Sequence, residues 1–435
     1  MNDNFQPLGS LLDNIAGGGT PSKNCSFYWN GNIPWASVKD FKDNQFGLFK
    51  TQDSITEEGL KSCSSKLIPP GIPLLCTRMA VGRASVTSFP TAINQDIKAL
   101  FPKEKQLDSA YLVRSLHYQQ EKLERVSIGS TVKGITLEQI KELLIFVPAI
   151  DEQKAIATIL DTIDEAIATA EAQLTKQEKI KQGLLQDLMK RGIDETGQIR
   201  PHWEDRPDLY KKTELGYLPI AWEVKTIDSL ANYVGSGVTP RGGSEVYKNS
   251  GILFIRSQNV TFDGLKLADV AYIDQSTHEA MQSSEIMAHD VLLNITGASI
   301  GRCCPVPKSL GIANVNQHVC AIRLPKPNEQ DANYLSLVLS SYIGQDQIAR
   351  LNAGGNREGL NYQQIRSFLI PWPKDLERSQ IVENLAFHKE DVISGGKELS
   401  KLKRIKTGLM QDLLTGQRRV TSELIRQVEI LTGSA

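Results

Sequence analysis

The sequence predicts a mixed α/β (α+β) protein in which two copies of one domain are joined by two long helices. Three observations predict this fold class. The chain aligns with itself over most of its length, each copy mixes short apolar runs with turn residues, and each copy ends in a stretch of coiled-coil periodicity. Its 435 residues also exceed what one core holds, which favours two or three domains.

The composition is that of a folded protein without a dominant charge. Lys and Arg number 49 and Asp and Glu 50, and 40% of the residues are hydrophobic. This balance excludes a disordered chain and a simple polybasic coat for nucleic acid. Six cysteines without a C-x-x-C pair exclude a zinc ribbon and a disulfide framework, and Cys303 and Cys304 are interpreted as reduced strand residues. The N-terminus lacks a signal peptide and no apolar run reaches about 20 residues, so we expect a cytoplasmic protein without a membrane partner.

The internal repeat fixes the domain organisation. A shift of 219 residues aligns Thr20-Pro21 with Thr239-Pro240, and small insertions raise the shift to 225 by the last block. That block aligns Gly183-Leu-Leu-Gln-Asp-Leu188 with Gly408-Leu-Met-Gln-Asp-Leu413. Two long copies form a pseudo-dimer, whose approximate two-fold axis suits a partner that is itself two-fold. The predicted order is a first α/β domain at 1–149, a helix at 150–191, a linker at 192–220, a second α/β domain at 221–373, a helix at 374–419 and a tail at 420–435.

Within each copy, apolar runs bounded by Gly, Pro, Asn and Asp predict short strands. The clearest of these strands are expected at 32–38, 72–77, 251–256 and 290–295. Helical stretches are expected at about 108–125 and 331–350, and the linker is interpreted as an irregular crossing segment.

Both long helices carry apolar residues at alternating spacings of four and three, the period of a coiled coil. The run covers about 35 residues, or ~50 Å, which is longer than one small domain can cover. We therefore expect the two seams to pack against each other in an antiparallel coiled coil; the alternative is that each packs on its own domain. The seam residues are Ile156, Leu160, Ile163, Ile167, Leu174, Leu184, Leu188, Ile381, Leu385, Val392, Leu399, Leu402, Leu409 and Leu413. His388, Gly395 and Lys406 interrupt the second seam.

Polar and cationic residues at turns and strand ends form the candidate binding surface of each α/β domain. Lys and Arg neutralise phosphates, and Arg, Asn and Gln can make bidentate contacts to base edges. The two copies differ most at these positions, for example Lys39 against Gln258, so two related domains would read two different sequences. The candidates are Thr20, Lys23, Ser37, Lys39, Arg78, Arg83, Lys133, Thr239, Arg241, Arg256, Gln258, Asn259, Thr296, Arg302, Asn356 and Arg357.

Catalytic signatures are missing from the sequence. It contains no phosphate-binding loop, no H-E-x-x-H, no G-x-S-x-G elbow and no amino-methyltransferase motif. One loose match to a metal-dependent nuclease, built on Asp208, Glu223 and Lys225, has no counterpart in the first repeat. We therefore predict no catalytic residue and no metal site in this chain.

The chain resembles the specificity subunit of a type I restriction–modification system over essentially its whole length. The resemblance is carried by the two Gly-Leu-(Leu/Met)-Gln-Asp-Leu helix ends, by Leu413-Leu-Thr-Gly-Gln-Arg-Arg-Val420, and by the segment 210–224. It implies two target-recognition domains that each read one half of a bipartite, asymmetric site in double-stranded DNA. It also implies that the helices set the gap between the halves and dock two methyltransferase subunits, with motor–nuclease subunits joining for cleavage.

The resemblance implies no cofactor in this chain, since S-adenosylmethionine, ATP and Mg would lie on the partner subunits. Thr169-Ala-Glu-Ala172 resembles a four-residue unit that some family members repeat inside the first helix. Two alternatives remain open. One is a stand-alone, pseudo-dimeric DNA-binding regulator, and the other is the metal-dependent nuclease described above.

Overall fold

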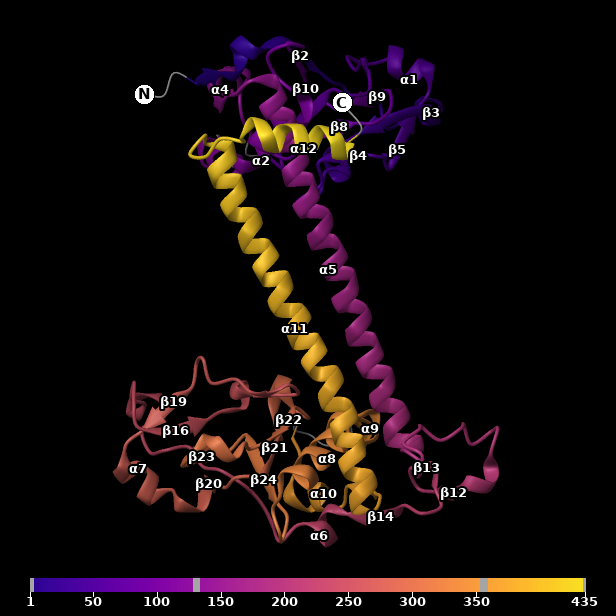
Figure 1. The fold of residues 1–435 in the computed structure, drawn as a ribbon, viewed down its shortest axis with the longest axis vertical. Helices are drawn as coiled ribbons and strands as arrows, with labels where there is room; N and C mark the ends of the chain where they lie inside the picture. The colour runs from indigo at the N-terminus through magenta and orange to yellow at the C-terminus, as the bar shows by residue number, and fades with distance from the viewer. Residues whose placement is uncertain (1–3, 128–133, 353–358, 433–435) are drawn as a thin grey trace. The chain divides into compact units, whose positions relative to one another are not determined.

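The computed structural model describes residues 4–127, 134–352 and 359–432. The chain divides into two compact units. Unit 1 holds Met1–Ala172 and Lys397–Ala435, and unit 2 holds Gln173–Gly396. Each unit therefore combines one α/β domain with parts of both long helices, so a unit is not the same as one sequence repeat (Figure 1).

The α/β domain of unit 1 contains a five-stranded and a four-stranded sheet. The first has the order β2 (Leu12–Gly17), β10 (Ile97–Pro102), β7 (Pro73–Cys76), β8 (Ala84–Thr87) and β4 (Gly47–Leu48). The second has the order β5 (Asp53–Ile55), β3 (Trp29–Ala36), β9 (Thr91–Ile93) and β6 (Leu67–Ile68). β1 (Phe5–Pro7) pairs with β11 (Leu144–Phe146), and the helices are α1 (Glu57–Lys61), α2 (Ser109–Tyr118), α3 (Gln120–Val126) and α4 (Leu137–Glu142).

The α/β domain of unit 2 repeats this topology. It has two four-stranded sheets. The first has the order β15 (Tyr233–Ser236), β24 (Val319–Arg323), β21 (Val291–Asn294) and β22 (Cys303–Pro305). The second has the order β19 (Ala271–Ile273), β16 (Ile252–Ile255), β23 (Ala313–Val315) and β20 (Glu285–Ile286). Two pairs flank them: β14 (Glu223–Thr226) with β25 (Leu369–Trp372), and β17 (Val260–Thr261) with β18 (Gly264–Leu265). The helices are α6 (Ile227–Leu230), α7 (Gln275–Ala280), α8 (Glu329–Ser340), α9 (Tyr342–Asn352) and α10 (Tyr362–Arg366). The parallel pair β16–β23 corresponds to β3–β9 of unit 1.

The two expected helical stretches of the α/β domains are each broken once. α2 and α3 are separated at Gln119, and α8 and α9 at Ser341. The Ser341 hydroxyl donates to the Val338 carbonyl and accepts from the Ile343 amide, so it satisfies backbone groups at the break. The break lets α9 turn away from α8 instead of continuing as one helix.

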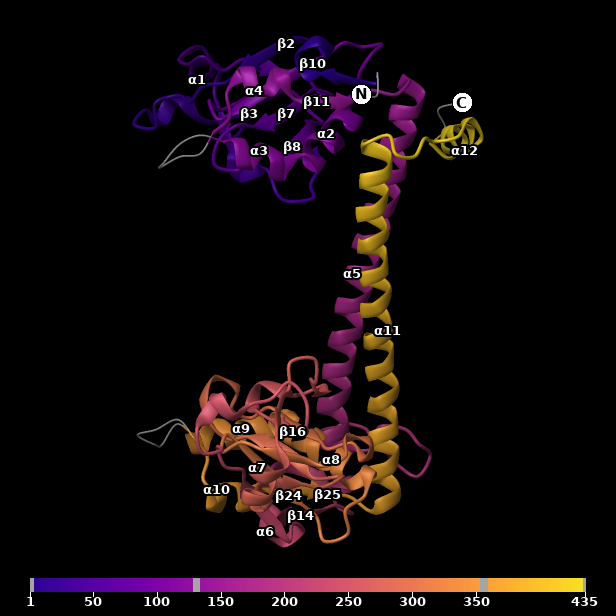
Figure 2. The ribbon, with the colours of Figure 1, turned by 90° about the vertical axis from the view of Figure 1, so that its left-hand side faces the viewer.

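The long helices α5 (Ile150–Arg191) and α11 (Asp375–Leu414) run antiparallel, which confirms the predicted fold class. In unit 1, Lys403 of α11 lies 2.8 Å from Glu171 of α5, and Lys406 lies 2.7 Å from Asp164. A later residue of α11 thus contacts an earlier residue of α5, as expected for antiparallel helices. In unit 2, Gly395 of α11 faces Leu174 of α5. Figure 2 shows the helices side by side within each unit. Every seam position of both helices is partly or fully buried.

Matching contacts anchor the two ends of the helix pair. The buried carboxylate of Glu152, in the first turn of α5, accepts hydrogen bonds from Arg419 at 2.6–3.1 Å and from the Val420 amide at 3.0 Å. Glu377, its counterpart in α11, accepts from both terminal nitrogens of Arg200 and, at 3.0 Å, from the Ile193 amide. In each unit, the segment that follows one helix is therefore tied to the start of the other helix.

The interpretation of the linker as irregular is wrong. β12 (Tyr210–Thr213) and β13 (Gly216–Pro219) form a hairpin, and the rings of Trp203 and Tyr217 stack with centroids 4.1 Å apart. The linker is ordered because Leu218 and Trp222 are buried in the core of unit 2.

The C-terminal tail contains a further helix, α12 (Ser422–Thr432), whose Ile425 and Val428 pack against the core of unit 1. Within the parts of the chain that the structure describes, we find no helix with the length and apolar character needed to span a membrane.

Candidate nucleic-acid interface

Four candidate residues of the first domain, Thr20, Lys23, Ser37 and Lys39, line a cavity of about 590 Å³ in unit 1. β3 and β9 are parallel neighbours, so the residues that follow their carboxyl ends, Ser37 and Asn94, meet at one edge of the sheet. β7 and β10 pair antiparallel and bring Thr77 beside Asp96 at the same edge. We call this the unit 1 cavity; it is lined by Thr20, Lys23, Trp29, Trp35, Ser37, Val38, Lys39, Asp53, Met79, Asn94, Gln95 and Asp96.

Two tryptophans build the apolar part of the unit 1 cavity. The rings of Trp29 and Trp35 meet edge to face with centroids 5.1 Å apart, and the Trp35 indole nitrogen donates to the Gly19 carbonyl at 3.0 Å. The exposed lysines Lys23 and Lys39 line the same cavity. It therefore combines aromatic surface with positive charge, a pairing that suits a nucleic acid.

A Thr–Gln hydrogen bond recurs in both repeats. The Thr20 hydroxyl donates to the Gln95 side-chain carbonyl in unit 1, and the Thr239 hydroxyl donates to the Gln317 side-chain carbonyl in unit 2. In unit 1 the bond joins the turn before β3 to the turn after β9, and in unit 2 it joins the turn before β16 to the turn after β23. The two repeats thus share a scaffold at this edge. Sequence reasoning did not select Gln95 and Gln317, although the internal alignment already pairs them.

In unit 2, the corresponding edge consists of Thr239, Thr296, Gln317 and His318, and we call it the unit 2 edge. Thr296 Oγ1 lies 2.6 Å from His318 Nδ1, and Gln317 Nε2 lies 3.0 Å from His318 Nε2. Arg241 and Arg302 are exposed cations of the same domain.

Arg256 and Gln258 make contacts within the second domain. The Arg256 guanidinium lies 5.6 Å from the Tyr247 ring centroid and donates to the Asp269 carbonyl at 3.1 Å. The Gln258 amide reaches the Asp269 carboxylate at 3.5 Å. Asp269, which lies on the loop after β18, therefore holds both candidates.

Three candidates serve the fold of their own loops. Ser37 is buried and its amide donates to the Asp40 carboxylate at 2.8 Å. The Arg83 guanidinium is bound by Asp43 at 2.8 Å and by the Phe41 carbonyl at 3.1 Å. Asn259 is 1% exposed, accepts from the Arg256 amide and donates to the Lys266 carbonyl. Their polar groups bind partners within the protein, so these residues stabilise the shape of the surface rather than offer polar groups to a ligand.

Lys133, Asn356 and Arg357 lie outside the described residues. The residues that follow these segments do have places in the structure. Gly134 forms a backbone bridge with Arg78, and Gly359 forms one with Thr296.

The residues of the nuclease pattern bind neighbouring cations. Asp208 lies 2.6 Å from Arg206, and Glu223 lies 2.8 Å from Lys225. These ion pairs lower the pKa of both carboxyls, chiefly through hydrogen bonds to Arg206 and Lys225. In the described part of the chain, no three His, Cys, Asp or Glu side chains are grouped so that they could hold a metal ion.

Comparisons with known proteins agree with this architecture. A family model described as a type I restriction modification DNA specificity domain matches residues 5–182 and 219–403. The chain is 24% identical to the type I restriction enzyme MjaIX specificity subunit of Methanocaldococcus jannaschii, over 94% of this chain and 92% of that one. It is 32% identical to the EcoR124I/EcoR124II specificity subunit of Escherichia coli over 38% of this chain and 42% of the relative.

Two solved structures share the fold. A type I restriction–modification S subunit from M. genitalium superimposes with a TM-score of 0.55 at 16% identity, covering 95% of this chain and 97% of that one. A chain from a study of complex assembly and conformational transition in the type I system gives a TM-score of 0.58 at 13% identity, with 94% and 97% coverage.

Proposed function

This chain belongs to the type I restriction–modification DNA specificity subunits, and from that premise we propose that the unit 1 cavity and the unit 2 edge are its DNA-reading surfaces. The subunit is non-catalytic, and its two target-recognition domains give it its DNA-recognition function. In the proposal, each surface contacts one half of a bipartite, asymmetric site in double-stranded DNA, and the helices set the gap between the halves.

The observation that carries this proposal is the shared Thr–Gln pair with different neighbours. Thr20–Gln95 and Thr239–Gln317 give the two domains one scaffold. The side chains around it differ between the units, with Lys23, Lys39 and Asp96 in one and Arg241 and His318 in the other. A shared scaffold that carries different polar side chains suits two domains that bind DNA in the same orientation but read different bases.

The test uses the complex of this chain with its methyltransferase subunits. Mapping of methylated adenines in a host that carries the complete system should reveal a split motif with two unlike halves. In binding assays, replacing Lys23 and Lys39 together by Ala should weaken binding and reduce the slope of log affinity against log salt by about 1–2, as expected for the loss of two phosphate contacts. Lys105→Ala is the control, because Lys105 follows the opposite end of β10 and is also exposed. A double variant that binds and depends on salt like the wild type would refute the proposed surface.

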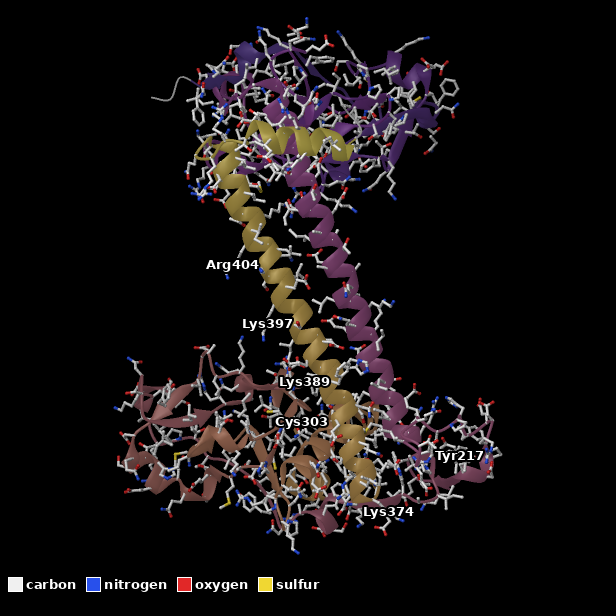
Figure 3. All side chains as sticks on the ribbon, in the orientation of Figure 1. Tyr217, Cys303, Lys374, Lys389, Lys397 and Arg404 are labelled. Atoms are coloured by element: carbon white, nitrogen blue, oxygen red, sulfur yellow. The ribbon has the colours of Figure 1, made fainter. Side chains whose placement is uncertain are left out.

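We also propose that the helices dock two methyltransferase subunits. Support comes from large apolar side chains exposed on α11, among them Leu376 at 74% and Phe387 at 67% in unit 2 and Ile405 at 41% in unit 1. Lys397 and Arg404 of unit 1 point from α11 away from α5 (Figure 3). Phe387→Asp should abolish co-purification of one methyltransferase subunit, whereas Glu390→Ala, on an exposed site of the same helix, should retain it. Co-purification of both subunits with Phe387→Asp would refute this surface.

The assembly completes the proposal. Motor–nuclease subunits would join the methylating complex for cleavage in the cytoplasm. S-adenosylmethionine, ATP and Mg would then be bound by the partner subunits and not by this chain. The specificity subunit would contribute recognition and spacing alone.

A further inference from the structure

One position at the reading surfaces differs in kind between the repeats. The residue directly after the shared glutamine is Asp96 in unit 1 and His318 in unit 2. Both lie in the turn that leads into the second strand of their sheet, β10 or β24, which has a neighbour on each side. The same scaffold therefore presents a carboxylate in one domain and an imidazole in the other.

Several hydrogen bonds fix Asp96. Its carbonyl accepts from the Thr77 amide at 2.8 Å and from the Thr77 hydroxyl at 3.0 Å, while its amide donates to the Asn94 side chain at 3.1 Å. The side-chain amides of Asn94 and Gln95 both approach Oδ2 at 3.5 Å. Oδ1 then faces Arg78, whose Nη1 lies 3.9 Å away. The carboxylate is thus held in position, with one oxygen turned to the arginine.

Arg78 stands at the tip of the loop that follows β7. Its backbone is anchored by the bridge to Gly134, and its side chain is 60% exposed, against 15% for Asp96. Its neighbour Met79 lines the unit 1 cavity, is 78% exposed and adopts a φ of 62°, a conformation that a residue with a side chain seldom takes. Arg78 therefore lies next to two residues that line the cavity, Met79 in sequence and Asp96 in space.

The Arg78–Asp96 pair contributes little to folding, because water screens an ion pair with one partner this exposed. It does restrict the guanidinium. Arginine carries five N–H donors in a rigid plane, so a carboxylate near one nitrogen leaves other donors free. Two donors along one edge of the planar guanidinium match the O6 and N7 acceptors of guanine in the major groove.

Unit 2 lacks this arrangement. Gly297, with a φ of 74°, takes the place of Arg78 in the internal alignment, and His318 bonds to Thr296 and Gln317 instead. The feature is therefore specific to the first domain.

We propose that Arg78 reads one guanine in the half-site of unit 1 and that Asp96 is the residue that positions Arg78 for it. This inference rests on the proposed DNA-reading role of the unit 1 cavity. It deepens that role by naming the base and the side-chain pair that selects it. In unit 2, the corresponding position selects no guanine.

The test measures binding of the complex with methyltransferase subunits to duplexes in which each base pair of both half-sites is replaced in turn. The wild type should lose about 10- to 100-fold in affinity at one G·C pair of the unit 1 half-site. Arg78→Ala should abolish the preference at that pair alone. Asp96→Asn, which keeps the shape and removes the charge, should reduce the same preference at least threefold, and Asp96→Glu should restore part of it. Preferences in the unit 2 half-site should stay unchanged in all three variants.

Asp43→Asn is the matched control, since it removes the carboxylate from the neighbouring Arg83–Asp43 pair and should leave every base preference intact. Equal weakening on all duplexes by Arg78→Ala would make Arg78 a phosphate contact and overturn the inference. An unchanged preference in Asp96→Asn would also overturn it. The proposed function is tested separately: if replacing Lys23 and Lys39 still reduces the slope of log affinity against log salt, the DNA-reading role of the unit 1 cavity stands even though this inference fails. Thermal unfolding of each variant, expected near that of the wild type, verifies that folding is intact.

Discussion

Arg114 is a buried cation whose charge is matched by two carboxylates of α5. Its side chain, 3% exposed, binds Asp161 and Asp164 of α5, and the guanidinium lies 3.4 Å from the centre of the Phe46 ring. Lys406, a polar interruption of the α11 seam, reaches the same Asp164 at 2.7 Å. Lys406 interrupts the apolar seam, but because it shares Asp164 with Arg114 it takes part in an ion-pair cluster that joins α2, α5 and α11.

His117 gives unit 1 a specific dependence on pH. Burial lowers the pKa of His117, the nearby cations Arg114 and Lys406 lower it further, and the Ala84 carbonyl, 2.8 Å from Nε2, and Asp43 act in the opposite direction. The folded state thus holds a neutral imidazole that becomes protonated on unfolding. The His117 contribution to the free energy of unfolding should be constant above a pH of about 6.5 and fall below it, by at most about 1.4 kcal/mol per pH unit. Chemical denaturation at pH 7.5 and 5.5 measures this, and His117→Gln should lose this part of the pH dependence. An identical dependence in both proteins would contradict the prediction.

At the scale of elements, the matching contacts of Glu152 and Glu377 hold the helix ends. Glu377→Ala leaves Arg200 and the Ile193 amide without their carboxylate in a site where both side chains are under 15% exposed. Breaking such a buried pair costs about 3–5 kcal/mol. The unfolding transition of unit 2 should shift accordingly in urea or on heating. Glu390→Ala, exposed on the same helix, should change stability by less than about 0.5 kcal/mol, and a loss of equal size in both variants would count against the role of Glu377.

The length of α5 should act as a spacer. Inserting a second Thr-Ala-Glu-Ala unit after Ala172 adds four helical residues, or ~6 Å, which is close to two base pairs at ~3.4 Å each. Methylated-base mapping should show a gap lengthened by one or two base pairs, with both half-sites unchanged. Replacing Thr169–Ala172 by four other helix-forming residues is the control and should keep the original gap. Altered half-sites would refute the spacer role.

At the scale of the molecule, each unit needs both halves of the chain. Leu413, Leu414 and Val420 share the core of unit 1 with Ile156 and Leu160. Leu188, Met189 and Ile193 belong to the core of unit 2. The cores are thus built from segments far apart in the sequence.

Fragments 1–205 and 206–435 should therefore fold only together. Each fragment alone exposes a long apolar seam, so it should aggregate or self-associate, whereas the two expressed together should co-purify and unfold cooperatively. Light scattering and thermal unfolding provide the measurements. A folded, monomeric fragment 1–205 would contradict the prediction. An intact chain with the exposed Glu204 changed to Ala is the control for damage to the linker itself.

Much of the fold could be predicted because the repeat and the coiled-coil period are local patterns. The strand expected at 72–77 is β7 (Pro73–Cys76), and the helix expected at 150–191 is α5. The linker could not be predicted, since Trp203 and Tyr217 are separated in sequence and the hairpin depends on burial of Leu218. The same reason applies at the site. The sequence indicates Thr20 from its turn and Lys39 from its strand end, but Asp96 is identified only through its contacts with Thr77 and Arg78.

The sequence by itself determined that the chain is one domain written twice with a helical seam after each copy, because residue spacing along a helix or strand already encodes which face is apolar. The tertiary structure decided which turns meet. The parallel pairing of β3 with β9 and of β16 with β23 brings Thr20 to Gln95 and Thr239 to Gln317, more than 70 residues apart in each case. It also decided that each compact unit takes parts of both long helices, because the apolar seams are buried against each other and, near the helix ends, in the cores of the α/β domains.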